Sequence, residues 1–457
     1  MQPVRLVPML ILLLTVAACA PTGRIAATPS LASASWSSQI QASARANARL
    51  AELMNAPELQ ILTIQAFKNN TDIRLALARV GQSHALLHAA RQATLPEISL
   101  GAAANRRFEK TGGNPLDFSD AFTRLDVNIE IDLFGRLSAG KLAAASRASA
   151  AELQRDAVVL AIETDVASAF VQRAAIARRI AILDNNIDRA VELERVIRVR
   201  AAQGAATRVD QGLQMIRLLN LREEASRLRQ ALDQTRTALA ILTGAEAPQF
   251  SVDEANMDKI VIPQLSPALP RDLLVARPDV RASEALIQAA NGDVGQARAA
   301  FYPQISLNAQ TMLASAATGP LGTSLNLSSS LLAPIFSRGR LQSAFQFASA
   351  VQLEAVERYR QTVLNALAEV EDAQSAKIRS AERAKLLDSI VTEASLTARL
   401  AKLQYIEGEE DLQNVLNAET SLSSAEDAQV VGWQERMYAQ IALYRAMGGY
   451  QKIISGI

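Results

Sequence analysis

The segment Ala93-Thr-Leu-Pro96-Glu-Ile-Ser-Leu100 returns in altered form as Ala300-Phe-Tyr-Pro303-Gln-Ile-Ser-Leu307. Each copy follows a stretch with helical spacing of apolar residues and opens a run in which apolar and polar residues alternate. The same offset of about 207 residues aligns Asp72-Ile-Arg with Asp279-Val-Arg, and after a small shift Gly204 and Gly244 align with Gly408 and Gly448. The chain therefore contains one unit of about 200 residues twice.

The composition favours long helices and excludes several classes of function. The 457 residues carry 47 basic and 46 acidic side chains, so we expect no nucleic acid partner. Aromatic residues make up only 4%, whereas Ala, Leu, Gln, Arg and Glu are frequent, as in coiled coils. The sequence contains no phosphate-binding loop or nucleophile elbow, and we expect neither an enzyme nor a bound cofactor.

The N-terminus has the pattern of an export signal. Arg5 precedes an apolar run from Leu6 to Val16, which is the length of a signal-peptide core and too short for a membrane-spanning helix. The run ends in Val-Ala-Ala before Cys19, the only cysteine of the chain. We expect a signal peptide at residues 1–18 and a tether at residues 19–56.

The residues before Cys19 resemble the lipobox of bacterial lipoproteins. This resemblance implies cleavage before Cys19, a diacylglycerol on its thiol and an acyl chain on its amino group. Ala20 stands where an aspartate commonly retains such proteins in the inner membrane, so the resemblance implies sorting to the outer membrane. The alternative is an ordinary signal peptide that ends near a cysteine.

Period-two alternation predicts four strands, near residues 96–107, 122–133, 303–313 and 324–333. In the second of them, Leu125, Val127 and Ile129 alternate with Asp126 and Glu130. Strands of about ten residues fit a tilted span of a bilayer, although a half-buried soluble sheet would show the same alternation. Four strands cannot close a barrel, so several copies would have to share one, and the charged faces favour three copies over two.

Two long stretches without Gly or Pro, 141–203 and 341–407, predict helices of about 65 to 70 residues that span roughly 100 Å each. Their apolar residues follow the 3.5-residue period of a supercoil. Gly204 and Gly408 would mark the tips where each helix turns back into an antiparallel partner. We expect structural repeats at 57–244 and 271–449, a proline-bearing connector at 245–270 that packs along the helices, and a tail at 450–457.

His84 and His88 are the only histidines and lie four residues apart, as two ligands on one helix face would. The pair lacks the glutamate of a zincin helix, and its counterparts in the second copy are Asn291 and Gly295. We therefore expect polar helix surface and no metal site.

The repeat, the lipobox, the Leu133-Phe-Gly-Arg136 segment and its counterpart Pro334-Ile-Phe-Ser-Arg-Gly-Arg340 together resemble outer-membrane efflux proteins related to TolC, in particular NodT-type lipoproteins. The resemblance implies a mainly α protein with a membrane β-barrel: a homotrimer with a 12-stranded barrel and a periplasmic α-helical coiled-coil barrel. It further implies docking to a periplasmic membrane-fusion adaptor and to an inner-membrane resistance-nodulation-division pump or ABC exporter.

The resemblance thus indicates a passive exit duct in the outer membrane for small toxic molecules or drugs. Two alternatives stay open from the sequence. The same duct could serve type I protein secretion, or the chain could be a lipid-anchored periplasmic coiled-coil scaffold whose strands form a soluble sheet.

The resemblance also places a periplasmic aperture at the tips, with Asp210 and Tyr405 at positions of the family's gating residues. Glu409, Glu410 and Asp411 follow Gly408 directly, whereas the first copy has Ala-Ala-Thr there. Acids at a helix start can simply complement the helix dipole. Repeated three times around an opening, they would instead form a cation-attracting ring. Asn417 stands where relatives often carry an acid, so a second ring is not expected.

Overall fold

The computed structural model describes residues 26–27, 48–111, 114–252, 256–266, 275–316 and 321–449. Cys19, the signal peptide and most of the expected tether lie outside these ranges. The chain forms two compact units. Unit one comprises residues 1–30, 78–153 and 281–362, and unit two comprises residues 31–77, 154–280 and 363–457, each within the described ranges. Among the described residues, no helix has both the length and the apolar character required to cross a bilayer.

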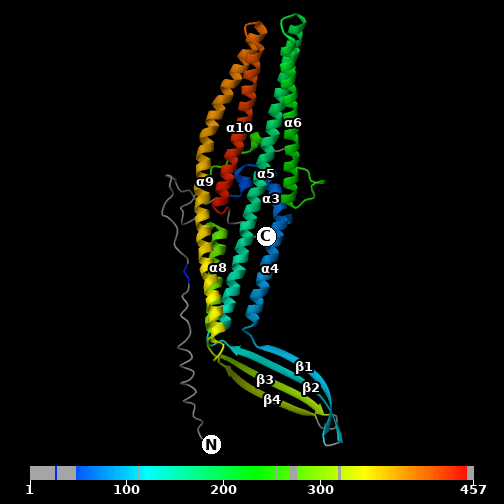
Figure 1. Cartoon of the computed structure of the whole chain (residues 1–457), viewed down its shortest axis with the longest axis vertical. Coiled ribbons are helices and arrows are strands. Elements are labelled where there is room, and N and C mark those ends of the chain that lie inside the picture. Colours follow the sequence, from blue (N-terminus) through cyan, green and yellow to red (C-terminus); the bar gives the residue numbers. More distant parts are fainter. Residues whose placement is uncertain are drawn as a thin grey trace. The chain divides into compact units, whose positions relative to one another are not determined.

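The elements follow one another twice in the order that the repeat predicts (Figure 1). The first copy contains α2 (Leu50–Leu53), α3 (Pro57–Asn69), α4 (Thr71–Gln92), β1 (Glu97–Thr111), β2 (Asn114–Ile131), α5 (Arg136–Ala202) and α6 (Arg208–Thr243). A short 3-10 helix, η1 (Met257–Lys259), lies in the connector. The second copy contains α8 (Pro278–Ala299), β3 (Gln304–Ala316), β4 (Gly322–Leu332), α9 (Arg338–Glu407) and α10 (Leu412–Ala446).

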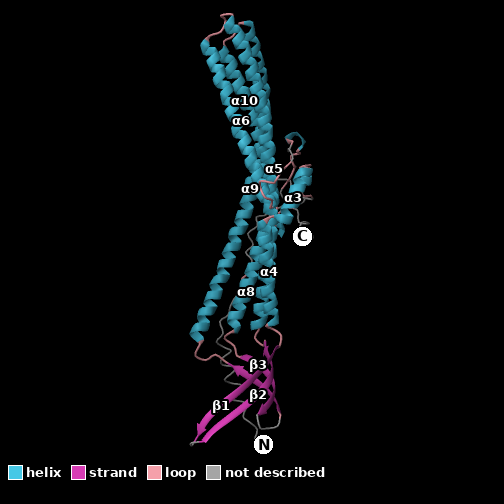
Figure 2. Ribbon diagram, turned by 90° about the vertical axis from the view of Figure 1, so that its right-hand side faces the viewer, coloured by secondary structure: helices cyan, strands magenta, loops and turns pink. Residues whose placement is uncertain are grey.

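The strands of unit one form a single antiparallel sheet with the order β1-β2-β3-β4 (Figure 2). The first hairpin is longer than expected, because pairing continues to Thr111 and Asn114 at its end. β2 therefore begins at Asn114, where the sequence predicted a start near residue 122. Backbone pairing needs no apolar side chains, so a hairpin can continue in water beyond the point where the alternation stops.

Near the sheet, α8 packs tightly against α5. A Cβ atom on Gly292 of α8 would lie 2.8 Å from both the carbonyl oxygen of Ala139 and the Cβ of Ala143 on α5. Only glycine allows the two backbones to approach so closely. At the junction of helices and strands, the rings of Phe134 and Tyr302 stack with centroids 4.7 Å apart. These contacts fix the ends of the strands against the helices of unit one.

Unit two contains the larger core, where helices from both copies meet. Its fully buried side chains include Phe170 of α5, Leu239 of α6, and Met437 and Tyr444 of α10. The connector contributes to this core, as the sequence predicted, because Ile260 and Leu265 are buried there.

The expected tether at 19–56 is too long by several residues. Residues 50–53 form α2, and Leu50 and Met54 are fully buried in the core of unit two. The Met54 carbonyl also accepts a hydrogen bond from the backbone N–H of Val261, at 2.9 Å. The folded body therefore begins before α3, and the spacing of Leu50 and Met54, one helical turn apart, is the sequence feature that indicates it.

Candidate functional site

The register of the sheet in unit one separates its side chains into two faces. One row across the four strands contains Leu100, Leu125, Thr311 and Leu325, and its neighbour contains Ser99, Asp126, Gln310 and Asn326. Successive side chains of a strand point to opposite sides, so these rows lie on opposite faces. The sheet therefore has one apolar and one polar face, which is the distribution the alternation predicted.

The polar face is connected by ion pairs and hydrogen bonds. Arg124 and Asp126 approach to 2.6 Å, and Gln310 on the neighbouring strand donates to Asp126 at 2.7 Å. Near the helices, Arg136 donates two hydrogen bonds to Glu130, at 2.9 and 2.6 Å. These charged side chains require water on this side of the sheet.

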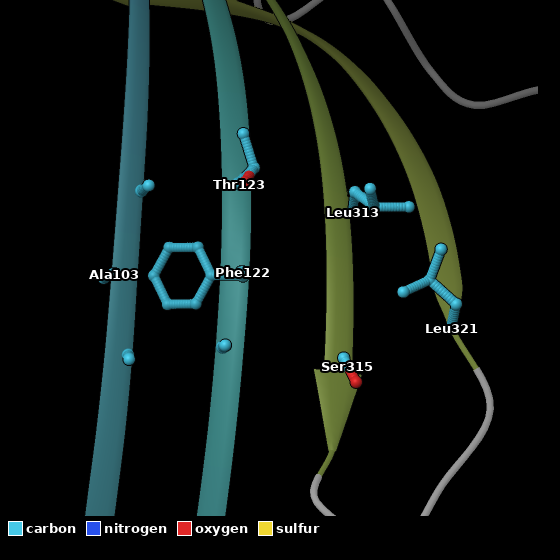
Figure 3. A pocket seen from close by; sticks show the side chains of 9 residues that line it. Ala103, Phe122, Thr123, Leu313, Ser315 and Leu321 are labelled. Atoms are coloured by element: carbon cyan, nitrogen blue, oxygen red, sulfur yellow. The ribbon is translucent and has the colours of Figure 1, made fainter.

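An open hollow lies on the sheet, where side chains of all four strand regions meet (Figure 3). Small side chains there leave a hollow of about 440 Å³ beside Leu313 and Leu321. Its other lining residues are Ala102, Ala103, Ala104, Ala121, Phe122, Thr123 and Ser315. None of these lining residues is charged, and all but Ala103 and Phe122 share the parity of the apolar rows.

The tips of the two hairpins lie in unit two and are joined to each other. Gly204 and Gly408 adopt left-handed backbone angles, with φ of 75° and 87°. The guanidinium of Arg200 stacks 4.5 Å above the ring of Tyr405 and donates a hydrogen bond to the Tyr405 carbonyl oxygen. Tyr405 is only 4% exposed. Arg200 was not identified from the sequence, although an arginine one turn before Gly204 is the feature that could have indicated it.

The acidic side chains near the tips have different environments. Asp210 belongs to a capping box with Thr207: its carboxylate accepts from the Thr207 backbone N–H at 2.6 Å. Asp411 is the N-cap of α10 without a side-chain capping bond, Glu410 accepts from the Asn414 amide, and Glu409 is exposed. The carboxylate of Asp210 therefore takes part in capping α6 at the first tip, whereas the side chain of Asp411 does not cap α10 at the second.

Two of the predicted aperture residues act electrostatically on a third, Tyr405. Burial raises the pKa of the Tyr405 hydroxyl, while Arg200 opposes this shift and the carboxylates of Asp210 and Asp411 add to it. The structure thus gathers Tyr405, Asp210 and Asp411 at one place, with Arg200 as the balancing cation.

Farther along the helices from the tips, arginines of the first copy pair with acids of the second and connect the two hairpins. Arg179 of α5 pairs with Asp427 of α10 at 2.5 Å, and Arg189 of α5 pairs with Glu426 at 3.1 Å. Arg217 of α6 lies 3.6 Å from Glu419, which is buried. The partners are more than 200 residues apart in the sequence, and no local pattern identifies them.

The two histidines have ordinary surface partners. His84 Nε2 lies 2.7 Å from Glu152 Oε1, and His88 contacts the Gln92 amide at 3.4 Å. Across the part of the chain that the structure describes, no group of three His, Cys, Asp or Glu side chains is placed to hold a metal ion.

Comparison with known proteins agrees with this geometry. The family model described as outer membrane efflux protein matches residues 62–245 and 269–449. The pyoverdine export outer membrane protein OpmQ of Pseudomonas putida is 31% identical over 429 residues, which cover 91% of each chain. Outer membrane protein OprJ of Pseudomonas aeruginosa is 29% identical and covers 96% of this chain and 95% of its own. The solved structure of the outer-membrane channel OprN superimposes with a TM-score of 0.87 at 25% identity, covering 94% of this chain and 98% of that one.

Proposed function

Because this chain belongs to the outer membrane efflux protein family and has the fold of the TolC-like channels, we propose that it works as a homotrimeric exit duct of a tripartite efflux system. Its role as an outer-membrane component of an efflux system follows from the family and the relatives. The proposal concerns its assembly, its partners and its cargo.

The two-faced sheet is the observation that carries this proposal. β1 and β4 are the outer strands of the sheet, and each has one edge that pairs with no strand among the described residues. An exposed apolar face suits lipid, and within lipid unpaired strand edges are not tolerated, so further strands must close a barrel. Three copies give twelve strands, with Leu125 and its row toward lipid and Asp126 and its row toward a water-filled lumen.

The energy for export comes from elsewhere, because a water-filled tube only provides a path. We propose that the tips dock to a periplasmic membrane-fusion adaptor. The adaptor connects them to an inner-membrane resistance-nodulation-division pump or ABC exporter. Exposed apolar side chains of α6, Leu213, Ile216 and Leu219, support the presence of a protein partner at this end. As cargo we propose small molecules, since the relative OpmQ is named for pyoverdine export.

Two finer proposals concern Cys19 and the tip acids. Cys19 carries a diacylglycerol and an N-acyl chain that anchor the chain to the outer membrane, with the helices in the periplasm. At the tip, Glu409, Glu410 and Asp411 form a cation-attracting ring in the trimer; in support, Asp411 makes no capping bond with its side chain and Glu409 is exposed.

A pair of substitutions in β2 tests the barrel. Ile129→Arg places a charge on the apolar face and Asn128→Arg places the same charge on the polar face. A lipid-facing arginine costs up to about 2 to 4 kcal/mol at the bilayer centre and less toward the interfaces, whereas a lumen-facing arginine stays hydrated. We expect Ile129→Arg to lose heat-resistant trimer on gels while Asn128→Arg keeps it. Equal loss in both variants would overturn the barrel.

A further inference from the structure

A side-chain amide of the second repeat binds the backbone of Ala26, in the N-terminal segment, through two hydrogen bonds. The side chain of Asn291, on α8, accepts a hydrogen bond from the backbone N–H of Ala26 through Oδ1 at 3.1 Å. Its Nδ2 donates to the carbonyl oxygen of the same residue, also at 3.1 Å. One side chain therefore satisfies both polar groups of one backbone residue, as a neighbouring strand would.

The surroundings of Asn291 hold its amide in this orientation. Gln352 of α9 donates to Asn291 Oδ1 at 2.7 Å. The adjacent Gly292 fixes the rotation of α8, because it packs directly on Ala139 and Ala143 of α5. Asn291 is half-buried between these contacts. A carboxylate could not donate to the Ala26 carbonyl, and alanine could form neither bond.

The equivalent position of the first repeat shows that the fold does not need an asparagine here. His84 stands there in α4 and pairs with Glu152 of α5 instead of with a backbone segment. Both repeats form the same helix and continue into the sheet. Among the described residues, this helix position therefore contacts the N-terminal segment in the second repeat and not in the first.

We propose that Asn291 is the clamp that fixes the lipid-anchored N-terminal segment on unit one and sets the length of chain between lipid and protein. This inference rests on the proposed acylation of Cys19. Cys19 precedes Ala26 by seven residues, which reach at most about 25 Å when extended. From Asn291 to Ala299, the end of α8 next to the sheet, the helix rises about 12 Å. The seven residues are therefore long enough to reach past the end of α8 toward the start of β3.

After residues 26–27, the next described contacts of this part of the chain are those of Arg49 with the Phe67 ring and of the buried Leu50, in unit two. The 31 residues from Cys19 to Leu50 can span at most about 110 Å, so a hold at Ala26 restricts the lipid to a much smaller range. The clamp consequently positions the anchor and shortens the chain that a protease can reach.

Trypsin nicking of the full, membrane-extracted protein tests the clamp. Arg24 lies two residues before Ala26, and Arg45 provides an internal reference site in the same segment. We expect Asn291→Ala to raise the cleavage rate after Arg24 about tenfold, as loss of both hydrogen bonds predicts, and to change the rate after Arg45 less than twofold. Asn291→Asp, which keeps only the acceptor, should fall between wild type and Asn291→Ala. His84→Ala is the matched control and should leave both rates unchanged.

Unchanged cleavage after Arg24 in Asn291→Ala, or an equal rise at both arginines, would overturn the clamp. Repeating the assay in Cys19→Ser separates it from the proposed lipid anchor. Because the two hydrogen bonds involve no lipid, the tenfold effect of Asn291→Ala should persist in that background. An effect that disappears in Cys19→Ser would show that the lipid with its bound detergent, and not Asn291, protects Arg24.

Discussion

Glu163 is the most deeply buried carboxylate among the described residues of unit two, and it predicts how the stability of this protein depends on pH. The side chain of this α5 residue is 1% exposed. Its Oε1 accepts from the Leu50 backbone N–H at 3.4 Å and from the Tyr444 hydroxyl at 3.3 Å, while Oε2 has no hydrogen bond. Leu367, at the matching place of the second repeat, shows that the fold accepts an apolar residue there.

Burial raises the pKa of Glu163 from 4.5 to about 7. The Leu50 N–H, Arg49 and Tyr444 oppose this shift, and Glu52 adds to it. Below pH 4.5 the group is protonated in both the folded and the unfolded chain. Between pH 4.5 and 7 the unfolded chain releases the proton while the folded chain keeps it, so the folded state loses about 3 kcal/mol of stability per protomer.

Glu163→Gln removes this titration while keeping size and polarity. We expect the variant and the wild type to have similar stability near pH 4.5, and the variant to become more stable by up to about 3 kcal/mol as the pH rises to 7, with no further change above. Thermal unfolding at one protein concentration measures the difference, since the stability of an oligomer depends on concentration. Tyr444→Phe, which removes a donor to the carboxylate, should raise the folded-state pKa and so extend the upper limit of this window to higher pH.

A difference between Glu163→Gln and the wild type that is equal at pH 5 and pH 8 would refute this reasoning. It would mean that Glu163 titrates in the folded protein as it does in the unfolded chain. The burial of the Glu163 side chain would then have no effect on its pKa, contrary to the argument above.

Three further predictions concern packing, selectivity and the anchor. Gly292→Ala should destabilise the protein by about 1 to 3 kcal/mol because α8 must move from α5, whereas Gly81→Ala, with open space around its Cβ, should stabilise α4 by about 0.5 to 1 kcal/mol in the same unfolding assay. Neutralising Glu409, Glu410 and Asp411 together should weaken cation selectivity in single-channel recordings; unchanged selectivity would leave only the helix-dipole role. Mass spectrometry of the mature protein should find an acylated N-terminus at Cys19, and a different mature start would contradict it.

Much of the architecture could be predicted because duplication made each feature visible twice. The long helices follow from stretches without Gly or Pro, and the faces of the sheet follow from the alternation between Leu125 and Ile131. The beginning of β2 was missed because Pro115, Asp117 and Asp120 have the composition of a turn. Backbone pairing with β1 overrides that local preference.

The contacts at the tips were less predictable. Tyr405, Asp210 and the acids after Gly408 were identified by their place near the turns and by resemblance. Arg200, which covers the Tyr405 ring, was not, because its partner lies 205 residues away. Pairs such as Arg217 and Glu419 form only when the two repeats come together, and periodicity within one helix carries no information about them.

The central claim, a membrane barrel with a polar lumen, is tested most directly by single cysteines placed along β2 from Arg124 to Ile131 and exposed to a membrane-impermeant maleimide in intact outer membranes. We predict labelling at the even positions, from Arg124 to Glu130, and none at the odd positions, from Leu125 to Ile131, because the two sets point to water and to lipid. Labelling without alternation, or labelling of the odd positions alone, would contradict the barrel.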